Sequence, residues 1–262
     1  MCGILGIINH KNKSKDLIND FSISLNYLNH RGPDDKKIVS FENNIFGFTR
    51  LAIIDLTNNG MQPFEDENSI LVFNGEIYNF LKLKIELQEL NIQFKSNSDG
   101  EVLKKYIDYF GIETSLKKID GMYSFCYFDK QKKETLLARD PFGEKPLYYS
   151  ISKNTLFFSS EIYSLKKLIN KQQDLNFQQL GYFLWKGYNT YENTIYKNIH
   201  TVKPNSYLRF YNNKILKFKK KLNISFNQNK AKLENFSNLL KDTVGSRMIS
   251  DHDIGCLISG GV

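Results

Sequence analysis

Short apolar runs bounded by turn residues occur in two groups along the first 160 residues of the chain. Runs of this kind are typical of strands. The first group comprises residues 3–9, 37–41, 45–49, 51–54 and 70–73, and the second comprises 123–128, 134–139, 147–150 and 155–159. Helical periodicity marks residues 14–29, 77–90 and 100–110. Two groups of strands accompanied by helices predict an α+β protein built in layers.

The composition changes after residue 210. Residues 212–229 are polar and rich in lysine, so the sequence predicts one domain over 2–210, a linker over 211–229 and a further segment over 230–262. In that segment a helix is expected at 230–248 and a strand at 254–258. The strand runs directly into Ser259-Gly260-Gly261. A strand followed by a glycine-rich turn is typical of the start of a nucleotide-binding α/β unit.

Several classes of protein are disfavoured by composition. No stretch is long and apolar enough for a membrane helix, and the apolar run at 4–8 is too short for a signal peptide, so we expect a cytoplasmic protein without a membrane partner. The three cysteines are far apart and predict reduced thiols. No CxxC or HxxxH spacing occurs, so no metal is expected. The net charge of +8 comes from scattered lysines, which does not predict a nucleic-acid partner.

Cys2 is the first candidate for chemistry, because it follows the initiator methionine. Removal of Met1 would place a thiol and a free α-amine on one residue. An α-amine has a pKa of about 7.7–8.0, so at neutral pH it can accept the thiol proton without a histidine. The alternative interpretation is a small apolar residue at the start of a buried strand.

Other residues could complete such a site. A thiol that attacks an amide needs an oxyanion hole, which the side chain of Asn74 and the backbone N–H of Gly75 could supply, although Asn-Gly also favours a hairpin turn. An amide substrate that also carries a carboxylate and an ammonium group, as glutamine does, would need a cation and an anion. Arg50 and Asp99 are the candidates, although Asp99 could instead cap a helix.

Seven ordered segments resemble the class II glutamine amidotransferases, and more narrowly the N-terminal half of the glutamine-hydrolysing asparagine synthetases. They are MCGILGI at 1–7, NHRGPDD at 29–35, TRLAIIDL at 49–56, QPF at 62–64, NGEIYN at 74–79, SNSDGE at 96–101 and ARDPFGEKPLYY at 138–149. SSEIYSLKKL at 159–168 and ISGGV at 258–262 extend the resemblance to the last residue. One departure is Gly100, where the family usually has a larger residue.

The resemblance implies a four-layer αββα N-terminal-nucleophile hydrolase sandwich, followed by the first helix and strand of an α/β ATP-pyrophosphatase domain that is truncated here. It implies Cys2 as the nucleophile and Asn74 with Gly75 as the oxyanion hole. The implied glutamine site adds Arg50, Leu51, Ala52, Ile53, Ile54, Glu76 and Asp99. ISGGV matches the opening of the family's pyrophosphate-binding loop, which implies an incomplete ATP site at Leu257, Ser259, Gly260 and Gly261.

The implied reaction is hydrolysis of glutamine to glutamate and ammonia through a Cys2 thioester. The ammonia would serve the ATP-dependent amidation of aspartate to asparagine. Glutamine hydrolysis itself implies no cofactor, whereas ATP and magnesium accompany the second reaction, which is not expected of these 262 residues alone. The sequence leaves open whether the protein forms a homodimer.

Three alternative functions stay open. One is an amidotransferase that acts on a sugar phosphate or a phosphoribosyl substrate, although NGEIYN and the SGG turn argue against it. Another is an enzyme of the same two-domain plan that amidates a different acceptor. The third is an inactive remnant or binding module, which a glutaminase assay would distinguish from an enzyme.

The role given to the α-amine predicts that the active protein begins at Cys2. Measurement of the intact mass of active protein should show the loss of Met1, because only then do the amine and the thiol share one residue. Full activity in a protein that retains Met1 would contradict this mechanism.

Overall fold

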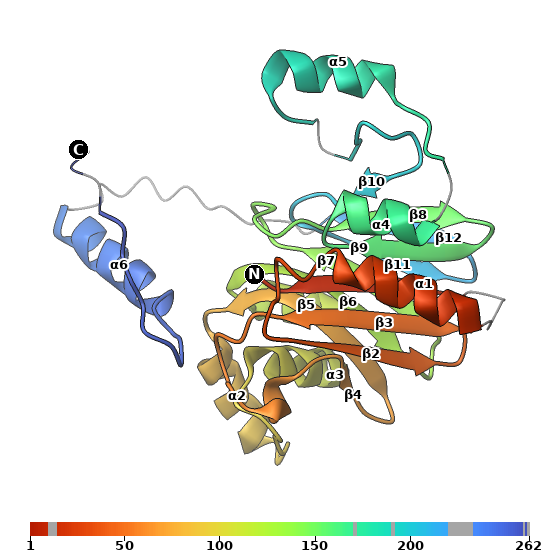
Figure 1. Cartoon of the computed structure of the whole chain (residues 1–262). Coiled ribbons are helices and arrows are strands. Elements are labelled where there is room, and N and C mark those ends of the chain that lie inside the picture. The colour runs from red at the N-terminus through yellow and green to blue at the C-terminus, as the bar shows by residue number, and fades with distance from the viewer. Residues whose placement is uncertain (10–14, 170–171, 190–191, 220–232, 259, 261–262) are drawn as a thin grey trace.

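The computed structural model describes residues 1–9, 15–169, 172–189, 192–219, 233–258 and 260. Its body holds two antiparallel sheets of six strands each (Figure 1). The strands are β1 (Gly3–Ile8), β2 (Asp35–Phe41), β3 (Asn44–Arg50), β4 (Phe64–Glu65), β5 (Ser69–Ile77), β6 (Gly121–Asp129), β7 (Glu134–Arg139), β8 (Tyr148–Ser152), β9 (Thr155–Ser159), β10 (His200–Thr201), β11 (Ser206–Tyr211) and β12 (Lys214–Lys219). The helices are α1 (Lys15–Asn26), η1 (Asn58–Gly60), α2 (Phe80–Glu89), α3 (Asp99–Lys118), α4 (Ile162–Ile169), α5 (Phe177–Lys186) and α6 (Leu233–Ser246).

The first sheet has the strand order β10-β8-β9-β1-β3-β2. Strand β1 lies inside it and pairs with β3 and β9, with Gly3 opposite Thr49 and Leu5 opposite Ser159. All six residues of β1 are buried, because both faces of the sheet are covered. A Cβ atom at Gly6 would lie 2.1 Å from the ring of Phe158, so the glycine makes room for that ring.

The second sheet has the strand order β12-β11-β7-β6-β5-β4. The turn predicted at Asn74-Gly75 is wrong, because β5 continues through both residues to Ile77 and pairs with β6 throughout. A Cβ atom at Gly75 would lie 2.1 Å from the carbonyl oxygen of Met122, so the glycine allows β5 and β6 to lie close together here. Helix α2 accordingly begins at Phe80, three residues later than predicted.

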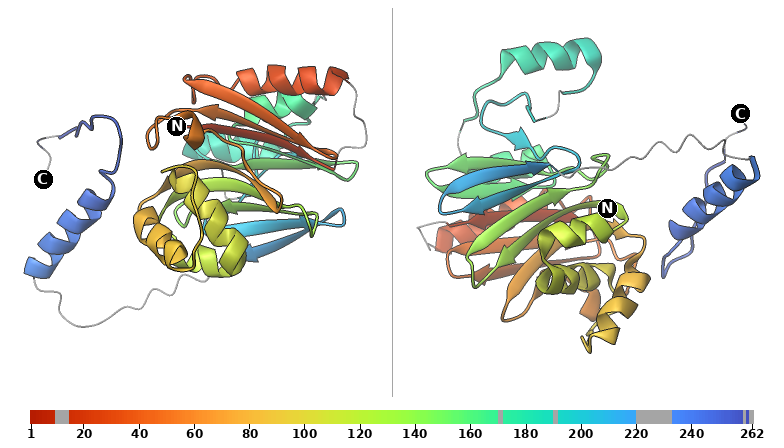
Figure 2. Two further views of the ribbon diagram at one scale, coloured as in Figure 1. Left: turned by 90° about the horizontal axis from the view of Figure 1, so that it is seen from below. Right: turned by 180° about the vertical axis from the view of Figure 1, so that it is seen from behind.

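Helices cover the outer face of each sheet, which gives four layers (Figure 2). Helices α1 and α4 pack on the first sheet, and α2 and α3 pack on the second. Apolar side chains from both sheets, such as Ile4 and Phe158 from the first and Val72 and Phe128 from the second, fill the space between them. The α+β layered architecture predicted from the sequence is therefore confirmed.

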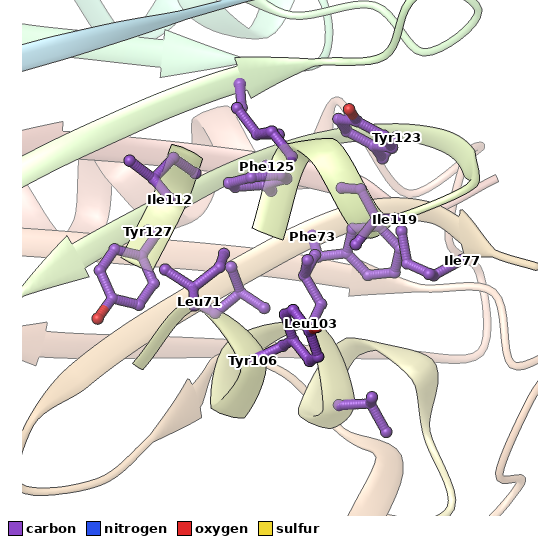
Figure 3. Packing of buried hydrophobic residues seen from close by; sticks show 14 of the residues in the cluster. Leu71, Phe73, Ile77, Leu103, Tyr106, Ile112, Ile119, Tyr123, Phe125 and Tyr127 are labelled. Atoms are coloured by element: carbon purple, nitrogen blue, oxygen red, sulfur yellow. The ribbon is translucent and has the colours of Figure 1, made fainter. Parts of the chain in front are cut away.

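Beneath the second sheet, the core is aromatic (Figure 3). Leu71, Phe73 and Phe125 from the sheet pack with Leu103 and Tyr106 of α3. The helix does not end near residue 110 as predicted. It continues to Lys118 across a break at Gly111, whose φ of 76° is a left-handed conformation that favours glycine.

The C-terminal region departs from the sequence prediction in two places. Strand β12 pairs with β11, so residues 214–219 of the predicted linker belong to the second sheet; residues 220–229 lie outside the described residues. The strand predicted at 254–258 is absent from the part of the chain that the structure describes, and Leu257 is fully exposed there. A strand needs a neighbour that takes up its backbone hydrogen bonds, and no described segment lies beside this one.

The ring of Phe158 should contribute strongly to stability, because it is fully buried between the two sheets. We expect Phe158→Ala to lower the free energy of unfolding by about 3–5 kcal/mol. Phe177→Ala is the control, since Phe177 in α5 is 75% exposed and should change it by less than about 0.5 kcal/mol. Chemical denaturation measures both, and equal effects would contradict the packing described.

Candidate active site

A pocket opens where the N-terminal end of β1 meets the ends of β3 and β5. It brings together residues that are far apart in the sequence. Of the predicted site residues, Cys2, Arg50, Leu51, Ile53, Ile54, Asn74, Gly75, Glu76 and Asp99 line it. Ala52 is not part of the lining, and its N–H donates instead to Asp34 Oδ2 at 2.8 Å. The strand predicted at 51–54 is wrong, because these residues form a loop. The N–H groups of Leu51 and Ala52 bond to side chains and not to a neighbouring strand.

The thiol of Cys2 is held by the backbone of Leu51. It donates to the Leu51 carbonyl oxygen at 3.5 Å and accepts from the Leu51 N–H at 3.4 Å. Burial raises the pKa of the Cys2 thiol, so the group stays protonated until a base removes the proton. The Cys2 carbonyl oxygen accepts a hydrogen bond from Arg31 Nε at 3.0 Å, which fixes the chain on the other side.

The amino terminus lies at the same pocket. Met1 is part of the lining, and burial lowers the pKa of its α-amine, with the nearby positive charges of Arg31 and Lys145 acting in the same direction. The negative charge of Cys2, when ionised, acts the other way. An amine in these surroundings loses its proton more readily than one in water, which suits a base.

Asn74 has an unpaired side chain. It is 1% exposed, and neither its Nδ2 nor its Oδ1 has a hydrogen-bond partner among the described residues. A buried polar group without a partner costs about 1–3 kcal/mol, so native structures rarely keep one without a reason. Because this amide lines the pocket, its N–H donors are free for a ligand.

Asp99 is a buried carboxylate at the start of α3. It accepts from the N–H of Ile77 and from the N–H of Gly100, both at 2.9 Å. The N-cap of the helix is Ser98, whose hydroxyl accepts from the N–H of Gly100. Helix capping alone therefore does not explain why a carboxylate is buried at position 99. Burial, with a smaller effect of Glu76, raises the pKa of Asp99 to about 7. A cationic ligand group would relieve this cost by pairing with the carboxylate.

Arg50 is buried and already has partners. It donates from Nη1 to the Thr57 carbonyl oxygen at 2.8 Å and from Nη2 to the Asp55 carbonyl oxygen. A Cβ atom at Gly60 would lie 2.6 Å from Nη2, so that glycine leaves space for the guanidinium. Arg50 thus holds the loop that follows β3, and its other N–H groups are at the pocket wall.

Lys145 also lines the pocket, although sequence reasoning assigned it no role. The carboxylate of Asp140 accepts from the N–H groups of Phe142, Glu144 and Lys145 at 2.9–3.0 Å, and this holds the loop that carries Lys145. Burial lowers the pKa of Lys145, while Glu76 acts to raise it. Burial also raises the pKa of Glu76. The signal was available in the motif ARDPFGEKPLYY. Its lysine lies between Gly143 and Pro146, which favour a turn, just before the strand expected at 147–150.

Gln62 is a second residue that sequence reasoning passed over. Its Nε2 donates to the Phe73 carbonyl oxygen at 3.1 Å, and its Oε1 accepts from the Phe73 N–H at 2.7 Å. It therefore occupies both backbone groups of the residue next to Asn74 and holds the middle of β5 in place. The motif QPF contained it, but a buried glutamine cannot be told from an exposed one in a single sequence.

The residues predicted for an ATP site are only partly described. Leu257 is exposed, Gly260 has open space around it, and Ser259 and Gly261 lie outside the described residues. Searches of the described ranges find no cluster of three or more side chains that could hold a metal, and no helix long and apolar enough to cross a bilayer.

Comparison with known proteins places this chain in a family. Residues 1–221 match the glutamine amidotransferase domain. Over its whole length the chain is 34% identical to a Methanocaldococcus jannaschii protein provisionally named glutamine-hydrolysing asparagine synthetase 2, of which it covers 55%. It is 31% identical to glutamine-hydrolysing asparagine synthetase 1 of Bacillus subtilis, of which it covers 42%. The chain thus spans about half the length of these relatives.

A solved structure shares the fold. Glutamine phosphoribosylpyrophosphate amidotransferase from B. subtilis superimposes with a TM-score of 0.62 and 20% sequence identity, over 85% of this chain and 50% of that one. The two antiparallel sheets and the pocket at the N-terminal end of β1 thus occur together with a matching family domain over residues 1–221. The chain belongs to the glutamine amidotransferase family.

Proposed function

We propose that the chain hydrolyses glutamine at Cys2 and that the N-terminal region is an N-terminal-nucleophile hydrolase. The observation that carries the proposal is the unpaired amide of Asn74, buried in the same pocket as the Cys2 thiol. The matched family domain supports it, since glutamine amidotransferases use the amide nitrogen of glutamine. An inactive remnant would have no reason to keep a buried amide unsatisfied.

In the proposed reaction, the α-amine of Cys2, free after removal of Met1, accepts the thiol proton. The sulfur attacks the amide carbon, and the negative charge that develops on the oxygen is stabilised by the N–H donors of Asn74 and Gly75. The C–N bond then breaks, the amine returns the proton to the leaving nitrogen, and ammonia departs. Water attacks the remaining thioester to release glutamate and the Cys2 thiol.

The rest of the pocket would hold the substrate. Asp99 would pair with the ammonium group of glutamine, because a cation would stabilise its buried carboxylate. Arg50 would hold the carboxylate with the N–H groups that the loop leaves unused. Leu51, Ile53, Ile54 and Glu76 would line the site, and the backbone of Ala52 would hold their loop to Asp34.

We further propose that the complete protein uses the ammonia to make asparagine from aspartate and ATP with magnesium. The names of two relatives that match the whole chain support aspartate as the acceptor, in preference to a phosphoribosyl substrate or another acid. Residues 230–262 would then begin the synthetase domain. The described residues of that segment do not form a phosphate site. The three free thiols fit a reducing compartment such as the cytoplasm.

Covalent labelling tests the nucleophile. A glutamine analogue with an electrophile in place of its amide should label Cys2, since only this thiol lies in the pocket. Cys256 is an exposed thiol and Cys126 a buried one, so both act as internal controls. Peptide mapping should find the label on Cys2, and Cys2→Ala should abolish ammonia release. Preferential labelling of Cys256, or activity that survives in Cys2→Ala, would refute the proposal.

Steady-state kinetics test the oxyanion hole. Asn74→Ala should lower kcat for glutamine hydrolysis by about 100- to 1000-fold with little change in KM, because the donor acts on charge that develops in the transition state. The matched control is Asn44→Ala, which removes another buried asparagine, one that accepts from Asn9 N at 2.9 Å outside the pocket. A similar loss of kcat in both variants would argue against the assignment.

A further inference from the structure

Asp251 makes two hydrogen bonds to the backbone of the loop that lines the pocket, one through its own N–H and one through its carboxylate. Its N–H donates to the Ile53 carbonyl oxygen at 2.9 Å, and its Oδ2 accepts from the Asp55 N–H at 2.7 Å. These partners are almost 200 residues away along the chain. They stand on either side of Ile54, which lines the pocket, as Ile53 does.

The loop at 51–57 has no ladder of its own to hold it. From the inside it is held by Arg50, as described above, and by the carboxylate of Asp55, which accepts from the N–H groups of Thr57 and Asn97 at 3.0 and 2.7 Å. Asp251 holds it from the outside. Because Leu51 in the same loop contacts the Cys2 thiol, the position of this loop determines both the pocket wall and the surroundings of the nucleophile.

Two neighbours of Asp251 fasten the same segment to the body. The guanidinium of Arg247 lies over the ring of Tyr78, 4.5 Å from its centroid. Ile249 packs against the hydrophobic cluster beneath the second sheet, as Ile54 does. Helix α6 itself stands apart from the two sheets (Figure 1), so residues 247–251 are its connection to the glutamine pocket.

We infer that Asp251 is a positioning residue for glutamine, which holds the loop at 51–57 in the conformation that binds substrate. The inference rests on the proposed function and extends it, because it makes the segment after α6 a determinant of glutamine affinity. A displacement of α6 would pull on residues 247–251 and loosen the pocket wall. Asp251 touches no reacting atom, so its loss should weaken binding and leave the chemical step largely intact.

The test compares point variants of the full chain. Asp251→Ala should raise KM for glutamine by about threefold to tenfold, the equivalent of one lost hydrogen bond of ordinary strength, with kcat nearly unchanged. Asp251→Asn keeps an acceptor oxygen and should stay close to wild type. Asp253→Ala removes an exposed carboxylate two residues further on that has no hydrogen bond or ion pair within the described residues, and it should have no effect.

Hydrogen exchange gives a readout that does not depend on activity. Amides in the loop at 51–57 should exchange faster in Asp251→Ala than in Asp253→Ala, whereas those of β1 should be unchanged. Equal KM values and equal exchange in these two variants would overturn the inference while the proposed function stands. A wild-type chain that releases no ammonia from glutamine would overturn the proposed function, and the inference with it.

Discussion

The pocket depends on the pairing of β1 with β3 and β9. The register that sets Gly3 opposite Thr49 brings Cys2 beside the loop that follows β3. There both the N–H and the carbonyl oxygen of Leu51 contact the sulfur of Cys2. Helices cover one face of this sheet and the second sheet covers the other, so β1 is buried throughout. The thiol of Cys2, the proposed nucleophile, is attached to this strand and cannot move without breaking ladder hydrogen bonds, which is how the fold would keep it aligned.

The second sheet supplies the polar partner of that nucleophile. Strand β5 pairs with β6 over all nine of its residues, and Gln62 occupies both backbone groups of Phe73. This support holds Asn74 with its amide unsatisfied, a cost of about 1–3 kcal/mol that the surrounding ladder offsets. Asp99 is a similar case, since its carboxylate is buried close to Glu76 without a cation pair. Both side chains destabilise the protein when no ligand is bound, and a ligand that pairs with them would remove this cost.

The remaining wall of the pocket is a loop, and loops move more easily than ladders. Arg50 and Asp55 hold it within the N-terminal region, and Asp251 holds it from beyond α6. The proposed glutamine pocket therefore includes a contribution from a segment outside the matched amidotransferase domain at 1–221.

The sequence by itself determined eight of the twelve strands that the structure describes, the layered α+β class and, through the family motifs, most of the pocket residues, because apolar periodicity and short motifs are local properties. It misplaced the end of β5 and missed β12 altogether, since Asn-Gly pairs and lysine-rich runs favour turns and linkers unless a neighbouring strand overrides them. Only the tertiary structure decided that Arg50 holds a loop, that Lys145 and Gln62 belong to the pocket and that Asp251 reaches it. Those contacts join residues from five to almost 200 positions apart, and one sequence carries no record of which backbone group a side chain will meet.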